Sequence, residues 1–262
     1  MTDHLAALNE LLAEPEALAQ AVAKSGPQEG DAQRIALGLI VSAWECYRGI
    51  RALVERRLVE EARMLSRTLI DDMALLMWFV VRRGELEHLA LRFFYTGVVD
   101  SERIQNAAEL AGFSWVEDMK AERAKELKAI CEAADEAGIT LRKLPNTRQL
   151  LEELHQERLY YWHTRASQGI HSTPIGLSAR LKLPEVEGDP IGIPLEGDPD
   201  LVVQVGVVAA ETFIGALAAA CNLLGWDEQR VRDAGEGFTP RAHALFDAVT
   251  GKPEPDEEPP KL

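Results

Sequence analysis

The sequence predicts an all-α protein that folds as a single bundle of about six to eight helices. Two observations lead to this prediction. Apolar residues recur at helical spacing through most of the chain, and glycine, proline and helix-capping residues separate the periodic segments. A third observation marks the exception. Five prolines between residues 174 and 200 exclude a long helix there, so we expect a proline-rich irregular segment or a short hairpin.

The expected helices follow from this pattern in chain order. The longer ones cover residues 2–24, 31–57, 59–82, 85–110, 114–137, 146–168 and 200–224, and two short ones lie near 227–233 and 240–249. The helix over 85–110 is either continuous or interrupted near Gly97. Asp31 and Asn146 are expected to cap the helices that follow them, and Gly84 and Gly112 to end the helices before them.

Length and composition indicate one domain. A chain of 262 residues, 47% of them hydrophobic, can bury one sizeable core. We therefore expect a single helical domain over residues 1–251. The remaining residues, 252–262, include four prolines and four acidic side chains, a composition typical of a disordered acidic tail.

Charge and cysteine usage limit the function classes. A net charge of -15 opposes binding to long DNA, because phosphate neutralisation dominates such binding. Three well-separated cysteines, at positions 46, 131 and 221, predict reduced thiols in a cytoplasmic protein. The apolar run over 201–226 is long enough to span a membrane but is interrupted by polar side chains that include Glu211. We interpret it as a core helix and expect no membrane partner.

The residues best suited to chemistry lie between positions 160 and 173. This stretch contains two tyrosines, a tryptophan, two histidines, an arginine and four hydroxyl side chains. Arg165 and His171 would lie about 120° apart on an unbroken helix. Gly169 is suited to a left-handed helix end, so we expect the helix to stop near Gln168 and His171 to return alongside Arg165.

An arginine beside a histidine is suited to metal-free phosphodiester chemistry. In this hypothesis His171 transfers a proton and Arg165 stabilises the charged phosphate oxygens. Ser167 and Ser172 would orient the phosphate, and Tyr161 would stack on a base. The alternative is purely structural, with Arg165 paired to an internal carboxylate and His171 capping the helix.

The spacing of Arg165 and His171 resembles the R-x4-6-H motif of the HEPN superfamily of helical bundles. Many members of that superfamily are dimeric, metal-independent endoribonucleases of bacterial toxin and defence systems, while others are inactive binding domains. The resemblance therefore implies either an endoribonuclease of a toxin or phage-defence system, with RNA or a cognate antitoxin as its partner, or an inactive binding domain. HEPN sites commonly carry Asn, Asp or His directly after the arginine. This chain has Ala166 there, which puts catalysis in doubt.

A second resemblance covers roughly residues 31–181. The segment 62–81, together with Tyr161, Ser167, His171 and Ser172, is similar to an uncharacterised bacterial family of helical proteins. That family combines an Arg-x3-Glu helix with a Ser-x3-His helix end. Here the first element is Arg67-x3-Asp71, with aspartate in place of glutamate.

Arg67 and Asp71 are four residues apart and therefore lie on one helix face. Because the helix is otherwise apolar, we expect both to point inward as a scaffold for Arg165 and His171. Two functions remain open. One is a non-catalytic interaction protein, expected to be a homodimer, with an internal Arg/Asp/His network. The other is the HEPN-like endoribonuclease.

Neither function requires a metal or another cofactor. Two Glu-x-x-His sequences, at 85–88 and 152–155, resemble half of a di-iron ligand set. The other helices supply no clear inward-facing glutamate except Glu211. We therefore expect no metal site and no cofactor.

Overall fold

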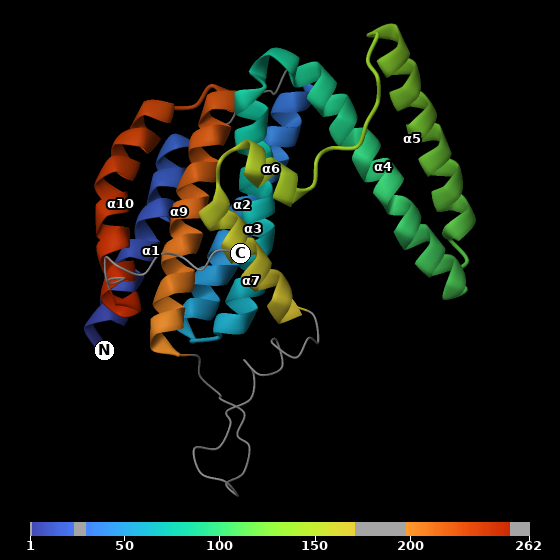
Figure 1. Cartoon of the computed structure of the whole chain (residues 1–262). Helices are drawn as coiled ribbons and strands as arrows, with labels where there is room; N and C mark the ends of the chain where they lie inside the picture. Colours follow the sequence, from blue (N-terminus) through green and yellow to red (C-terminus); the bar gives the residue numbers. More distant parts are fainter. Residues whose placement is uncertain (1, 24–29, 171–197, 252–262) are drawn as a thin grey trace, which may run out of the picture.

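The computed structural model describes residues 2–23, 30–170 and 198–251. Within these ranges the chain forms nine α-helices and one short 3-10 helix and no strand, so the all-α prediction is confirmed (Figure 1). The helices are α1 (Thr2–Val22), α2 (Asp31–Glu55), α3 (Val59–Val81), η1 (Arg83–Glu85), α4 (Leu86–Leu110), α5 (Val116–Glu136), α6 (Thr147–Glu153), α7 (Glu157–Ile170), α9 (Pro199–Leu224) and α10 (Glu228–Thr250). The expected irregular segment and acidic tail fall mostly or wholly outside the described residues.

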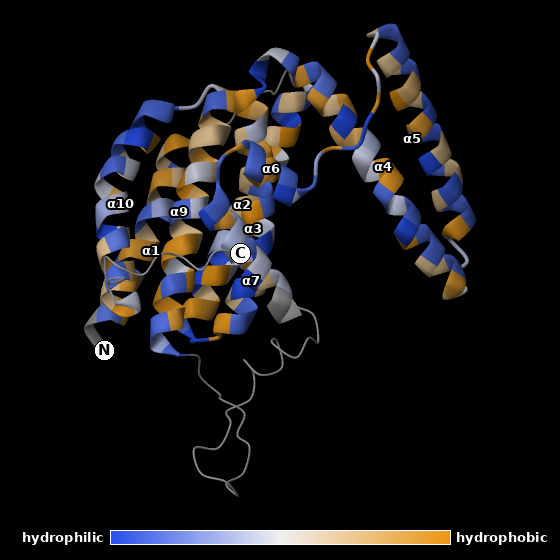
Figure 2. Ribbon diagram, viewed as in Figure 1, coloured by the Kyte–Doolittle hydropathy of each residue, from blue (hydrophilic) through white to orange (hydrophobic). Residues whose placement is uncertain are grey.

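Helix α9 is the centre of the bundle and packs against α1, α2, α3 and α10. Figure 2 shows many hydrophobic residues along α9, beside α10 and α2. Asp198 caps its first turn, and Gly225 ends it in the left-handed conformation with φ 68°. By length and hydropathy α9 could cross a membrane, yet 67% of its most apolar window is buried inside the bundle. It is therefore a core helix, as expected from its polar interruptions.

Aromatic stacking joins α2 to α9. The rings of Tyr47 and Phe213 stack with centroids 4.7 Å apart, and Trp44 meets Phe213 edge-on at 6.0 Å. The hydroxyl of Tyr47 donates a hydrogen bond of 2.7 Å to the carbonyl of Leu12 on α1. Three helices therefore meet at one ring pair, and burial raises the pKa of Tyr47.

A buried carboxyl group, that of Asp72 on α3, lies between α2 and α3. Asp72 is 7% exposed, and burial raises its pKa to about 6 against a hydrogen bond from Ser42. Its second oxygen, Oδ2, has no hydrogen-bond partner in the described residues. Burial and the charge of Asp72 also raise the pKa of the Cys46 thiol to about 11. The thiol therefore stays protonated at neutral pH.

The raised pKa of Asp72 predicts a pH-dependent loss of stability. Between its ordinary value near 3.8 and about 6, the folded protein binds this proton more tightly than the unfolded chain. The free energy of unfolding should therefore fall as pH rises through this range, by about 2–3 kcal/mol from this group. Denaturant unfolding at a series of pH values checks this. The Asp72→Asn variant should lack this pH-dependent change in the free energy of unfolding. The same pH slope in the variant and the wild type would show that Asp72 is not its source.

Helices α4 and α5 form an antiparallel arm that leans away from the bundle (Figure 1). Helix α5 packs mainly on α4, and α4 reaches the bundle chiefly through α2. The connector that returns from α5 is tied to α4, because Arg92 donates to the carbonyls of Arg142 and Lys143 and Lys143 pairs with Asp100 at 2.7 Å. This attachment fixes where α6 begins.

Several element boundaries differ from the predicted ones. The helix expected over 146–168 is divided into α6 and α7 at His155, which has a φ of 53°. The two short helices expected near the C-terminus are one helix, α10, which continues through Pro240. Burial of Phe238 and Ala242 on either side of Pro240 offsets the missing backbone hydrogen bond. Gly30 occupies the N-cap position of α2, where Asp31 was expected.

Candidate functional site

The candidate site lies where α3 packs against α7. Asp71 contacts His163, and Arg63, two turns earlier on α3, contacts the later residue Arg165. The earlier residue of α3 thus contacts the later residue of α7, and the later residue of α3 contacts the earlier one. The two helices therefore run antiparallel here. This arrangement brings the Arg67–Asp71 segment of α3 against the middle of the stretch that the sequence singled out.

An aspartate–histidine pair is the centre of the site. Nε2 of His163 lies 3.1 Å from Oδ1 of Asp71, and the same oxygen accepts a hydrogen bond of 2.5 Å from the hydroxyl of Thr147. The side chain of His163 is 14% exposed and that of Asp71 is 35% exposed. Because one ring nitrogen is held by the carboxylate, the imidazole has a fixed orientation. Its other nitrogen, Nδ1, makes no hydrogen bond within the described residues.

The capping residue Asn146 determines where Thr147 lies. Asn146 accepts a hydrogen bond of 3.0 Å from the backbone N–H of Gln149, and the Gln149 side chain accepts one from the N–H of Asn146. This reciprocal capping box fixes the first turn of α6. Asn146 was the predicted cap, and that prediction is confirmed.

Arg67 lies one helical turn before Asp71, on the same face of α3. It is half-buried. Among the described residues no side chain or carbonyl is within hydrogen-bond or ion-pair distance of its guanidinium. Instead of pairing with Arg67, Asp71 binds Thr147 and His163. The site therefore contains a half-buried cation that forms no ion pair with any described residue.

The other predicted residues of α7 divide between two helix faces. Ser167 lies one turn after His163 on the side facing α3, and its hydroxyl donates 2.8 Å to the His163 carbonyl. Tyr161 and Arg165 lie on the opposite side, with the guanidinium carbon of Arg165 6.0 Å from the centre of the Tyr161 ring. Arg165 enters the site only through its carbonyl, which accepts 2.8 Å from Arg63.

His171 and Ser172 lie outside the described residues, so their predicted roles stay predictions. Helix α7 ends at Ile170, two residues after Gln168, near which it was expected to stop, and it continues through Gly169. A single glycine inside a helix costs only about 1 kcal/mol, which the packing of α7 against α3 offsets. The predicted left-handed end at Gly169 is therefore wrong.

The sequence analysis did not single out His163 or Thr147. His163 had a usable signal, because it lies four residues before Ser167 and therefore shares its face. Thr147 had none. Its contact with Asp71 spans 76 positions and depends on how α6 packs.

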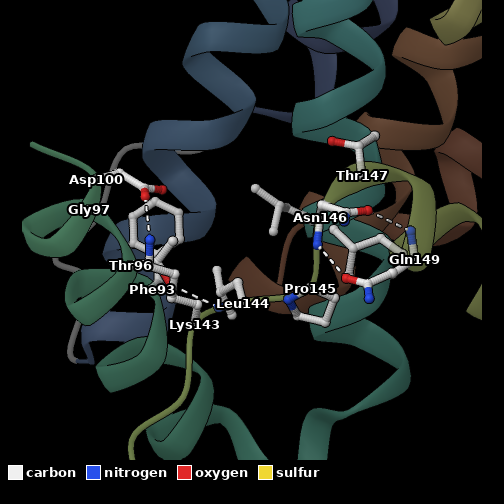
Figure 3. Close-up of a pocket in the computed structure, with 12 residues that line it drawn as sticks. Phe93, Thr96, Gly97, Asp100, Lys143, Leu144, Pro145, Asn146, Thr147 and Gln149 are labelled. Carbon is white, nitrogen blue, oxygen red and sulfur yellow. Dashed lines mark hydrogen bonds and ion pairs between the residues drawn. The ribbon is translucent and has the colours of Figure 1, made fainter. Parts of the chain in front are cut away.

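A cavity of about 560 Å³ adjoins the site on the side of the arm. Thr147, which donates a hydrogen bond to Asp71, also lines this cavity (Figure 3). Its opposite end is formed by the Asp100–Lys143 ion pair, and apolar side chains that include Phe93 and Leu144 lie between the two ends. The opening is therefore amphipathic and is shaped jointly by the bundle and the arm.

A second polar cluster lies between α7, α9 and α10. Nε2 of His243 is 2.9 Å from Oε1 of Glu211 and 3.3 Å from Nη1 of Arg158. One nitrogen cannot both donate to the carboxylate and accept from the guanidinium, so only one of these two contacts is a hydrogen bond. Burial raises the pKa of Glu211 despite both neighbours. We interpret the cluster as an ion-pair network that joins three helices.

The two Glu-x-x-His sequences lie at the surface. Glu85, His88, Glu152 and His155 are all exposed. In the described residues no group of three or more His, Cys, Asp or Glu side chains is arranged to hold a metal ion.

Fold and site together define the class: an all-α bundle with an aspartate–histidine pair between two antiparallel helices and, one turn away on α3, an arginine that pairs with none of the described residues. Residues 33–189, more than half of the chain, match the family described as "Family of unknown function (DUF5677)". The chain belongs to that family. No curated protein and no solved structure matches the chain. The predicted membership of an uncharacterised family is thus confirmed, while the HEPN resemblance stays a prediction.

Proposed function

We propose that the site between α3 and α7 cleaves RNA without a metal ion, as a HEPN-like endoribonuclease of a toxin or phage-defence system would. The observation that supports this is a carboxylate-held imidazole, His163, whose partner Asp71 lies one helical turn after Arg67, a cation that pairs with none of the described residues. This changes the residues assigned to the chemistry. His163 takes the place that the sequence suggested for His171, and Arg67 that of Arg165.

The geometry suggests a role for each group. The imidazole of His163 takes the proton of a ribose 2′-hydroxyl while Asp71 holds the opposite ring nitrogen and stabilises the imidazolium. The 2′-oxygen attacks the adjacent phosphorus, the bond to the 5′-oxygen breaks, and that oxygen takes a proton from solvent. Arg67 binds the non-bridging phosphate oxygens, on which charge accumulates. The products would be a 2′,3′-cyclic phosphate and a 5′-hydroxyl.

Arg67 is the cation that supports an anionic substrate, although the chain as a whole has a net charge of -15. Of the two other arginines nearby, Arg63 is bound by Glu60 at 2.9 Å, and the side chain of Arg165 lies on the opposite side of α7. A short RNA segment at this local site needs far fewer phosphate contacts than a long duplex.

RNA cleavage in the presence of EDTA tests the proposal. A labelled single-stranded RNA should be cut to products with cyclic phosphate ends, and a DNA strand of the same sequence should stay intact because it lacks the 2′-hydroxyl. RNA that stays intact at equimolar protein would overturn the proposal. So would cleavage of both strands alike.

A non-catalytic interaction role is the second candidate, and a different observation favours it. The α4–α5 arm carries a cluster of exposed large apolar side chains around Leu110, Phe113 and Trp115, which is typical of a protein-binding surface. In this role the polar groups of α3 and α7 are structural. With this role we also propose that the protein is a homodimer in the cytoplasm, as the sequence analysis expects. Sedimentation velocity of the full chain distinguishes a monomer from a dimer.

A further inference from the structure

Exposed apolar side chains are concentrated on one part of the molecule. Five of the eight exposed large hydrophobic residues in the described ranges belong to the α4–α5 arm: Phe94, Ile104, Leu110, Phe113 and Trp115. Three of these lie within six residues at the turn between the two helices. Leu110 is 91% exposed and is the most exposed of the eight. A large apolar group so placed indicates a contact surface.

The tip of the arm, residues 109–118, has a defined shape. Gly112 has a φ of 73°, which closes the turn after α4, and the N–H of Phe113 donates to the carbonyl of Ala108 at 3.1 Å. The rings of Phe113 and Trp115 stack with centroids 5.2 Å apart. A partner would therefore meet a preformed aromatic platform, and little conformational entropy would be lost on binding.

The arm has little interior of its own. Apart from Leu89 and Ala90, which join the main core where α4 begins, its buried apolar side chains are Val98, Ala108, Val116 and Ala134, and these four lie outside that core. Side chains on the face of α5 that meets α4 stay half-buried, as Met119, Leu127 and Ile130 do. Because α4 and α5 leave the side chains between them partly exposed, a third helix packed against both would bury more of their apolar surface.

Charge around the tip distinguishes between partners. Residues 86–136 contain eleven acidic and six basic side chains. Glu109, Glu117 and Asp118 surround the apolar tip, and the nearby cation Lys120 is already bound by Glu109 at 3.0 Å and by Glu117 at 3.1 Å. A second copy would bring the same negative charge to the contact. A basic partner would be attracted.

We propose that the tip of the arm binds an amphipathic, lysine- or arginine-rich helix of another protein. The apolar side of that helix packs on Leu110, Phe113 and Trp115. Its basic flank faces Asp118 and the carboxylates of Glu109 and Glu117, which share the cation Lys120. This deepens the interaction role proposed above and is independent of RNA cleavage.

Fluorescence anisotropy with two synthetic helical peptides tests this proposal on the full chain. One peptide places leucine on one face and lysine on the other, and the second has glutamate in place of every lysine. The wild type should bind the basic peptide, more weakly as salt rises, and should not bind the acidic one. The double variant Leu110→Ser/Trp115→Ser should lose about tenfold or more in affinity, as expected when central apolar contacts are removed.

The matched control is Val41→Ser/Val81→Ser, which removes two exposed apolar side chains from α2 and α3 and should bind like the wild type. Circular dichroism checks that both double variants are folded. Equal binding by the wild type and the tip variant would overturn the proposal. A wild type that sediments as a dimer while the tip variant is a monomer would also overturn it, because a second copy would then cover the tip. RNA cleavage should be unchanged in the tip variant, so failure here is separable from failure of the nuclease role.

Discussion

Replacing His163 by alanine should lower the rate of RNA cleavage in EDTA by a factor of about 10²–10⁴, the usual contribution of a positioned acid–base group. The imidazole is held by Asp71 at 3.1 Å, so its loss removes the proton acceptor without removing an apolar core side chain. The measurement is the single-turnover rate at saturating protein, which separates the chemical step from substrate binding. Asp71→Asn should lower the same rate, because the amide cannot stabilise an imidazolium.

His88→Ala is the matched control, since His88 is an exposed histidine on α4 away from the site. Its rate should equal that of the wild type. If His163→Ala is folded and cleaves RNA at the wild-type rate, His163 is not the acid–base group. If His171→Ala alone loses activity, the assignment first suggested by the sequence is the correct one.

Replacing Phe213 by alanine should reduce the free energy of unfolding by about 3–5 kcal/mol, the range for buried Phe→Ala changes. Phe213 is fully buried in α9. It stacks on Tyr47 and meets Trp44 edge-on, so the cavity left behind would separate α2 from α9. Urea unfolding followed by circular dichroism gives the free energy. A loss of this size is a large part of the stability of a typical domain.

Phe113→Ala serves as the control, because Phe113 is 53% exposed at the tip of the arm and surface changes of this kind alter stability by about 0.5 kcal/mol or less. Equal effects of the two substitutions would mean that the ring pair of α2 and α9 is not central to the core.

Local sequence signals were sufficient for the helices and most of their ends. Asn146 caps α6 as its residue type and spacing indicate, and Gly112 ends α4 with a positive φ. The break between α6 and α7 could not be predicted, because it uses a left-handed His155 with no glycine or proline nearby. The continuity of α10 through Pro240 depends on tertiary packing, which local patterns do not contain.

The site was only partly accessible from sequence. The sequence pattern identified Asp71 and the α7 stretch. It did not reveal which of the two histidines in that stretch, His163 or His171, contacts Asp71. The contact between Asp71 and His163 spans 92 positions and follows from the antiparallel packing of α3 on α7. A helical wheel of residues 160–170 places His163 and Ser167 on one face and Arg165 on the other. The sequence analysis did not use this, because it considered Arg165 only together with the nearby His171.

The most direct test of the central claim is whether the site that contains Arg67 and the Asp71–His163 pair binds a phosphodiester. A dinucleotide with a 2′-deoxy sugar at the attacking position binds without being cleaved, and calorimetry at low salt measures its affinity. Arg67→Met should weaken binding by about tenfold or more, the cost of losing a charge-assisted contact. Arg103→Met, at an exposed position on the arm, should leave it unchanged. Equal affinity in Arg67→Met and the wild type, or no binding by the wild type, would contradict the account.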